Sequence, residues 1–222
     1  MGKLFSLDNR LMLCAEMVRK NSTVADIGTD HAYLPVWLCK KGICKKGLAC
    51  DIKSEPLKNG IKTIEKYEAQ KLVEPRISDG LLSVGENEAD DIVIAGMGGE
   101  LIVRIMSEWK YSKNSDKRFI LQPMTKCEEV IRFLCENGFE ILAQKSCVAD
   151  KKVYTVLNAS YVDKTFTPDN VFWYLGKLDP KANETDMLYA QNVVKHLEKK
   201  QRGDSMYKQA FDEICEYLGE KP

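Results

Sequence analysis

The chain has 222 residues, of which 44% are hydrophobic and 30% are charged, so its composition is that of a globular protein with one full domain and a smaller appendage. Its 33 basic and 33 acidic residues cancel, so the net charge does not indicate a strongly basic nucleic-acid binder, although a local basic patch is compatible with it. No apolar run approaches the roughly 18 residues of a membrane span, and the first residues lack the pattern of a signal peptide. We therefore expect a cytoplasmic protein without a membrane partner.

The N-terminal half alternates between amphipathic helices and apolar strands. Residues 6–19 have the apolar spacing of a helix with Ser6 as its N-cap. The sequence predicts further helices at residues 35–41 and from Ser54 onward, where a serine, an acid and an early proline form a strong helix start. The strands between these helices are predicted at residues 23–27, 47–52 and 73–78.

The same alternation continues over the next hundred residues. The segment 91–95 is apolar throughout, which favours a strand buried on both faces, and the following helix is predicted to turn Leu101, Ile102, Ile105 and Met106 inward. A strand at 118–121, a helix at 127–136 and two strands at 139–147 and 152–159 complete the series, and the last two strands are predicted to form an antiparallel hairpin. We expect an α/β fold with a doubly wound, seven-strand, Rossmann-like sheet.

The C-terminal quarter has a different pattern. Residues 171–178 and 186–219 are predicted to be helical, with a break at 202–204. Across that break, apolar side chains are expected to pack against one another; they are Leu188, Val194 and Leu197 on one side and Tyr207, Phe211, Ile214 and Leu218 on the other. This α-helical hairpin is too short to bury a core alone and must pack on the sheet domain or on a partner. The predicted domains are residues 1–162 and 163–222.

The eight cysteines are scattered and lie mostly in apolar segments. None of them forms the Cys-x-x-Cys pair that is typical of a zinc site. A free cysteine packs as a small hydrophobic residue. The sequence therefore predicts buried free thiols in a reducing compartment and no metal site.

Acidic and glycine residues follow four of the predicted strands. In an open α/β sheet, ligands bind at the carboxyl ends of the strands, so these residues are expected to meet at one edge. The four segments are Asp26 to His31, Asp51, Ser78 to Gly80 and Gly96 to Gly99. Each segment alone is weak evidence, because turns after strands are often rich in aspartate and glycine. Four of them in one domain are a much stronger indication of a site.

The charges in these segments discriminate between cofactors. The first turn lacks the second and third glycines of a dinucleotide fingerprint and has Asp30 and Ala32 in their place. A carboxylate there would repel a pyrophosphate, whereas S-adenosylmethionine carries a sulfonium and an ammonium group. Asp26 and Asp30 are suited to its amino-acid end. Asp51 is suited to the ribose hydroxyls, and Asp79 to the adenine amino group.

Five segments together carry a resemblance to a known family. They are VADIGTDHAYLP (24–35), ACDI (49–52), ISDGL (77–81), DIVIAGMGGELI (91–102) and LQPMT (121–125). In these segments the chain resembles the TrmK family of bacterial tRNA (adenine-N1)-methyltransferases, over most of the first 160 residues. The resemblance implies a seven-strand methyltransferase domain with a C-terminal, coiled-coil-like helical domain. It also implies transfer of a methyl group from S-adenosylmethionine to N1 of an adenine at position 22 of tRNA.

The resemblance also assigns site residues. The implied cofactor contacts are Asp26, Gly28, Thr29, Asp30, His31, Asp51, Ile52, Asp79, Gly80, Ala95, Gly96 and Met97. Where methyltransferases of exocyclic amines have an Asn-Pro-Pro-aromatic loop, this chain has Gly-Met-Gly-Gly, which favours a ring nitrogen as the acceptor. A ring nitrogen already carries a lone pair, so alignment matters more than a general base. The candidate catalytic residues are Asp30, Met97 and Gly98, and the carbonyls of Gly96 and Met97 compete with Asp30 for the stabilising role.

A paired adenine must leave its helix before N1 can react, so the protein is expected to bind unpaired or flipped-out RNA. The candidate substrate-binding residues are Arg10, Gln122, Pro123, Lys199, Lys200 and Arg202, where the basic side chains would contact phosphates. We expect tRNA as the partner, and a monomer rather than an obligate oligomer. Two alternatives remain at this stage. One is a methyltransferase acting on a small molecule or a protein, and the other is a non-catalytic binding module of the same fold.

Overall fold

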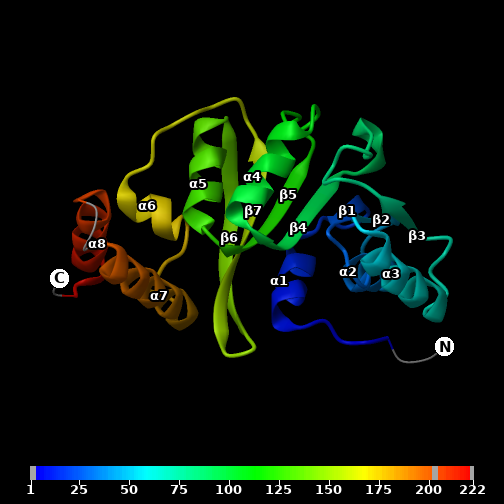
Figure 1. The fold of residues 1–222 in the computed structure, drawn as a ribbon, viewed down its shortest axis with the longest axis horizontal. Coiled ribbons are helices and arrows are strands. Elements are labelled where there is room, and N and C mark those ends of the chain that lie inside the picture. The colour runs from blue at the N-terminus through cyan, green and yellow to red at the C-terminus, as the bar shows by residue number, and fades with distance from the viewer. Residues whose placement is uncertain (1–3, 202–204, 221–222) are drawn as a thin grey trace.

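The computed structural model describes residues 4–201 and 205–220, and its centre is a seven-stranded sheet in the order β3-β2-β1-β4-β5-β7-β6 (Figure 1). Strand β7 runs antiparallel to both of its neighbours, and the other pairings are parallel. The strands are β1 (Thr23–Ile27), β2 (Lys46–Asp51), β3 (Val73–Ile77), β4 (Asp91–Gly98), β5 (Arg118–Thr125), β6 (Phe139–Ala149) and β7 (Lys152–Tyr161). The predicted sheet and its terminal hairpin are confirmed.

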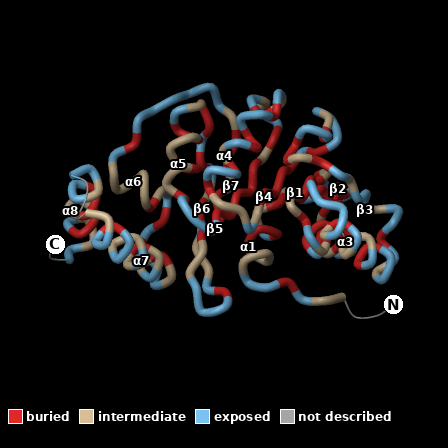
Figure 2. The backbone as a smooth tube through the Cα atoms, in the orientation of Figure 1, coloured by how far each residue is buried: buried red, intermediate tan, exposed pale blue. Residues whose placement is uncertain are grey.

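Helices cover both faces of the sheet. One face packs against α4 (Gly99–Glu108) and α5 (Cys127–Glu136), and the other packs against α1 (Asn9–Met17), α2 (Tyr33–Lys40) and α3 (Ser54–Lys66). Buried residues concentrate along the central strands (Figure 2). In β4, Ile92 and Ile94 belong to the first core, whereas Val93 between them belongs to the second, as expected where successive side chains alternate between two buried faces.

Helix α1 begins later than the sequence predicts. Its N-cap is Asp8, whose carboxylate accepts a hydrogen bond of 2.8 Å from the Leu11 amide, while Ser6 is exposed and lies upstream. Aspartate and serine cap helices about equally well, so the spacing of apolar residues could not distinguish the two positions. The later start brings Arg10 onto the first turn of the helix, above the end of β5.

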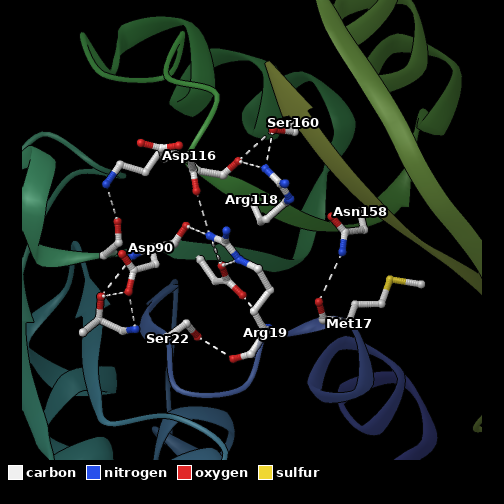
Figure 3. A network of polar contacts seen from close by, with 12 residues as sticks. Met17, Arg19, Ser22, Asp90, Asp116, Arg118, Asn158 and Ser160 are labelled. Carbon is white, nitrogen blue, oxygen red and sulfur yellow. Dashed lines mark hydrogen bonds and ion pairs between the residues drawn. The ribbon is translucent and has the colours of Figure 1, made fainter. Parts of the chain in front are cut away.

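The segment after α1 is tied to the central strands by Arg19. Its Nε donates to Oδ1 of the fully buried Asp91 at 2.7 Å, and its Nη2 donates to the carbonyls of Asp90 and Asp116 (Figure 3). The Asn158 side chain donates to the carbonyl of Met17 at the end of the same helix. These bonds hold α1 against β4, β7 and the loop before β5, and so help to fix the position of Arg10 at the other end of the helix.

Strands β4 and β5 are longer than predicted. They continue to Gly98 and Thr125. Beyond Ala95 the pairing has two irregularities, which set Met97 opposite Pro123 and Gly98 opposite Thr125. Glycine-rich segments after a strand are typical of turns, so the sequence pointed to a helix start at Gly96. The structure begins α4 at Gly99, because the irregular pairing lets the strand extend through the glycines.

Three C-terminal helices, α6 (Asn170–Leu175), α7 (Glu184–Lys200) and α8 (Ser205–Leu218), share a third core. Val194, Leu197, Tyr207, Phe211, Ile214 and Leu218 belong to it, as predicted. The inward placement predicted for Leu188 is wrong, as is that for Leu101 in α4, because both side chains are exposed. The predicted break at residues 202–204 lies outside the described residues.

Hydrogen bonds join these helices to the sheet. The Gln144 side chain in β6 accepts a bond of 2.8 Å from the Lys177 amide. In the same strand, Ser146 donates to the carboxylate of Asp186 in α7. Seven of the eight cysteines are buried, and Cys147, the eighth, is half-buried; all eight are free, as predicted.

Candidate active site

The sheet order brings the predicted segments to one edge. Strand β1 pairs with β2 on one side and with β4 on the other, so the chain reverses its winding direction between β1 and β4. This is the switch point at which open α/β sheets bind ligands. The segments that follow β1, β2, β3 and β4 therefore lie along the same edge, next to the end of β5.

The first loop is bent sharply at Gly28, which has a φ of 73°. The amides of Gly28 and Thr29 both donate to the carbonyl of Cys50, at 2.8 and 3.0 Å, so the loop is fixed to the end of β2. A Cβ on Gly28 would lie 2.2 Å from Cε of Met97. The Met97 side chain therefore rests directly on the Gly28 backbone, and the β1 and β4 loops touch.

Asp26 is a buried carboxylate at the centre of this edge. Its pKa is raised to about 6, mainly by burial and also by the nearby Asp51, whereas a hydrogen bond of 2.6 Å from the Thr29 hydroxyl and the charge of Arg10 limit the rise. A buried carboxyl with a raised pKa is typical of functional sites. A cation bound here would favour the ionised form, which suits the ammonium group of an amino acid.

Asp51 is the second buried acid of the edge. Its Oδ1 accepts a bond of 2.9 Å from the Lys53 amide, while Oδ2 has no partner within the described part of the chain. The next residue, Ile52, is an apolar side chain with 56% of its surface exposed. A free carboxylate oxygen beside an exposed apolar surface matches a nucleoside, whose hydroxyls need an acceptor and whose base needs a flat apolar contact.

Asp30 and His31 form the outer rim of the first loop. Both side chains are substantially exposed, and Nε2 of His31 lies 3.4 Å from Oδ2 of Asp30. The His31 ring stacks on Tyr33 with 5.1 Å between ring centres. Asp30 has a φ of 43°, a backbone conformation that non-glycine residues seldom adopt outside constrained turns. The strained turn directs these side chains away from the core.

Asp79 has a partner that the sequence did not reveal. Nη2 of Arg104, on the first turns of α4, donates to its Oδ1 at 2.8 Å. Arg104 also forms an ion pair with Glu108, one turn later in the same helix. Gly80 has a φ of 56°, and a Cβ on it would lie 2.9 Å from the side chain of Ile105. The end of β3 is thus held against α4, with Asp79 at the surface.

Gln122, which is fully buried, organises the end of β4. Its Oε1 accepts bonds from the Gly96 amide at 3.0 Å and from Nη1 of Arg10 at 2.8 Å, and its Nε2 donates to the carbonyl of Pro123. The Arg10 side chain is only 22% exposed. The sequence suggested Arg10 as a phosphate contact, and in the structure its guanidinium bonds the same Gln122 oxygen that accepts the Gly96 amide.

The last glycine of the same loop is a packing position. A Cβ on Gly99 would lie 2.1 Å from the carbonyl oxygen of Lys126, at the start of α5. Gly98 and Ala95 are half-buried beside it. Within the Gly-Met-Gly-Gly segment, Met97 contacts Gly28, and Gly96 is exposed next to Arg10.

The remaining substrate-binding candidates lie farther along the chain. Lys199 is exposed on the last turn of α7, and Nζ of Lys200 lies 4.8 Å from the ring centre of Tyr207. Lys200 also lines a groove that begins at Pro123. Arg202 lies outside the described residues. Within residues 4–201 and 205–220, we find neither a helix that could span a membrane nor a cluster of potential metal ligands.

The mixed seven-stranded sheet, the bent loop after β1 and the buried acids at the ends of β1 and β2 are the features of an S-adenosylmethionine-dependent methyltransferase. The family described as "Methyltransferase domain" matches residues 7–157. A Bacillus subtilis protein named tRNA (adenine(22)-N(1))-methyltransferase is 31% identical over 172 residues, which are 78% of this chain and 72% of that protein. This chain belongs to the TrmK family of tRNA (adenine(22)-N1)-methyltransferases.

Solved structures agree with this assignment over the whole chain. The B. subtilis m1A22 tRNA methyltransferase TrmK matches with a TM-score of 0.82 and 26% identity, covering 98% of this chain and 97% of that one. A Streptococcus pneumoniae protein solved in complex with S-adenosyl-L-methionine matches with a TM-score of 0.87 and 26% identity, covering 96% and 100%. The similarity therefore includes the C-terminal helices, where the sequence resemblance was limited to size and helical character.

Proposed function

We propose that this chain transfers the methyl group of S-adenosylmethionine to N1 of adenine 22 in tRNA. The observation that carries the proposal is the end of β4, where Gln122 holds the Gly96 amide and no side-chain acceptors for an exocyclic amine stand in the Gly-Met-Gly-Gly segment. The relatives named above supply the RNA and the position of the adenine.

Bound S-adenosylmethionine supplies an electrophilic methyl group whose carbon–sulfur bond breaks, with the electron pair left on sulfur, as the N1 lone pair forms the new nitrogen–carbon bond. No proton leaves N1, so the chain does not need a general base. What the protein must do is align the two reactants and stabilise the positive charge that moves onto the adenine ring. The carbonyls of Gly96 and Met97 and the carboxylate of Asp30 are the candidates for that stabilisation.

The geometry of the edge supports the proposed cofactor contacts. Asp26 and Asp30 meet the amino-acid end, with Thr29 holding Asp26 in place. Asp51 accepts from the ribose hydroxyls through its free Oδ2, and the exposed Ile52 packs against the nucleoside. Oδ2 of Asp79 accepts a hydrogen bond from the adenine amino group, while Oδ1 remains bonded to Arg104. The walls of the proposed cofactor site also include Gly28, His31, Gly80 and Ala95.

The proposal extends to the organisation of the protein. Residues 1–162 form the catalytic domain and residues 163–222 the helical domain that helps to hold the RNA. The protein acts as a monomer, and its substrate places the reaction in the cytoplasm. The target adenine is flipped out or unpaired when it reaches Gly96.

A methylation assay on a defined transcript tests the proposal. The tRNA is incubated with labelled S-adenosylmethionine, and the product is mapped by primer extension, which stops at N1-methyladenine. We expect incorporation and a stop at position 22. A transcript with guanine at position 22 is the matched control and should remain unlabelled. Equal labelling of both transcripts would contradict the assigned position, and no labelling of any tRNA would contradict the substrate class.

A further inference from the structure

A groove of about 420 Å³ runs between the sheet domain and the C-terminal helices. One wall is the end of β5 and the start of α5, from Pro123 to Lys126, and the floor includes Tyr154 at the start of β7. The opposite wall is formed by Tyr174 of α6 and by His196 and Lys200 of α7. The groove thus begins one residue beyond Gln122, which contacts the Gly96 loop.

The lining combines flat rings with positive charge. Tyr154, Tyr174 and His196 offer faces on which a base can stack, and Lys126 and Lys200 contribute two cations. Lys126 is paired with the exposed Glu100 at 2.5 Å, so part of its charge is already compensated. The only acidic residue among the described lining is Glu128. This composition is complementary to a nucleotide, with its aromatic base and anionic phosphate.

The groove is formed before any ligand arrives. Ser146 and Asp186 join β6 to α7, and the Gln144 side chain holds the segment after α6 through the Lys177 amide. On the other side, the guanidinium of Arg132 in α5 stacks on the Trp173 ring of α6, with 3.7 Å to its centre. A preformed groove lowers the ordering cost of binding.

We propose that this groove binds an unpaired nucleotide of the tRNA that flanks the target adenine, with its base against Tyr154 and its phosphate near Lys200. The inference rests on the proposed function. Strand β5 spans the distance from Gln122 to Thr125, about 10 Å at the usual rise of a strand. A single RNA strand that presents its adenine at Gly96 therefore reaches the groove with its neighbouring nucleotides.

Steady-state kinetics on full-length variants test the groove. Tyr154→Leu removes the stacking face and Tyr154→Phe keeps it, and Tyr154 is the better choice because Tyr174 and Tyr189 also pack in the helical core. We expect Tyr154→Leu and Lys200→Glu each to raise the KM for tRNA about tenfold. Tyr154→Phe and Lys164→Glu, an exposed lysine elsewhere on the surface, should stay within twofold of the native protein. The Kd for S-adenosylmethionine should not change in any of them.

A binding measurement separates the groove from the reaction. A tRNA with 2-aminopurine next to position 22 reports stacking by fluorescence quenching. The quenching should occur with the native protein and Tyr154→Phe, and it should be lost with Tyr154→Leu. If Tyr154→Leu retains the native KM and quenching, the groove proposal is wrong although the protein still methylates tRNA. If the native protein does not methylate adenine 22, the proposed function fails, and the quenching comparison still decides whether the groove holds RNA.

Discussion

Nη1 of Arg10 lies 2.8 Å from Oε1 of Gln122, and the same oxygen accepts the Gly96 amide at 3.0 Å. One buried side-chain oxygen therefore connects the first helix with the Gly96 loop, which we propose to face the transferred methyl group. Arg10, which the sequence suggested as a phosphate contact, is thus bonded to the residue that holds this loop.

The first prediction distinguishes these two roles of Arg10. Arg10→Ala should lower kcat about tenfold or more, because the Gln122 amide and the Gly96 loop lose their anchor. The dependence of KM for tRNA on salt should keep its native slope. If Arg10 binds a phosphate instead, the slope of log KM against log salt should fall by about one while kcat is retained. Kinetics at several salt concentrations decide between them, with Lys20→Ala, an exposed lysine beyond the other end of α1, as the control.

Asp26→Asn should weaken cofactor binding and stabilise the protein. At pH 7.5 the native chain must bury an ionised carboxylate whose pKa is raised to about 6, mainly by desolvation. Because the folded pKa lies above the unfolded value, this carboxyl favours the unfolded state at high pH, by up to about 3 kcal/mol. We expect the variant to gain that stability above pH 6 and to lose the gain towards pH 4. Denaturant unfolding at both pH values measures it.

The affinity for S-adenosylmethionine should also depend on the ionisation of the Asp26 carboxyl. Ionisation at high pH lowers the stability of the fold, but it should strengthen cofactor binding. As the pH falls through about 6, Asp26 takes up a proton and no longer attracts the ammonium group, so the Kd for S-adenosylmethionine should rise. Calorimetry between pH 5 and 8 should show this dependence in the native protein and a flat, weak profile in Asp26→Asn. A native profile without any change across this range would contradict the assigned contact.

Gly28→Ala should impair binding more than folding. At its φ of 73° an alanine costs about 1 kcal/mol, and the new Cβ would meet Cε of Met97 at 2.2 Å, which displaces that flexible side chain from its place on the β1 loop. Gly42→Ala is the matched control, since Gly42 has a φ of 70° and no neighbour within 4 Å. Both variants should lose a few degrees of Tm. Only Gly28→Ala should raise the Kd for S-adenosylmethionine, by at least tenfold.

The pair formed by Arg19 and Asp91 should dominate the stability of the N-terminal segment. Arg19→Ala leaves a fully buried carboxylate without its cation, which costs about 3 kcal/mol or more. Burial raises the pKa of Asp91 and Arg19 opposes that rise, so without Arg19 the group should protonate more readily and the loss should shrink in acid. Chemical unfolding at pH 7 and pH 5 measures the difference, and an equal loss at both would contradict the electrostatic explanation.

The strands and most helices could be predicted because their apolar periodicity is local. The site was predictable to the extent that it lies at strand ends: Asp26, Asp51 and Asp79 come to one edge once the sheet order is known. Contacts between distant segments were not predictable. The pairing of Arg104 with Asp79 and the position of Arg10 depend on how α4 and α1 pack, which no spacing in the sequence encodes.

Gly99 limits how this enzyme could be redesigned. Grafting an Asn-Pro-Pro-aromatic loop in place of Gly-Met-Gly-Gly, to retarget the chemistry to exocyclic amines, would put the aromatic residue at this position. Even a methyl group there would come within 2.1 Å of a backbone oxygen at the start of α5. A change of acceptor atom would therefore require moving a whole helix. The choice between ring nitrogen and amine is built into the architecture as well as into the loop.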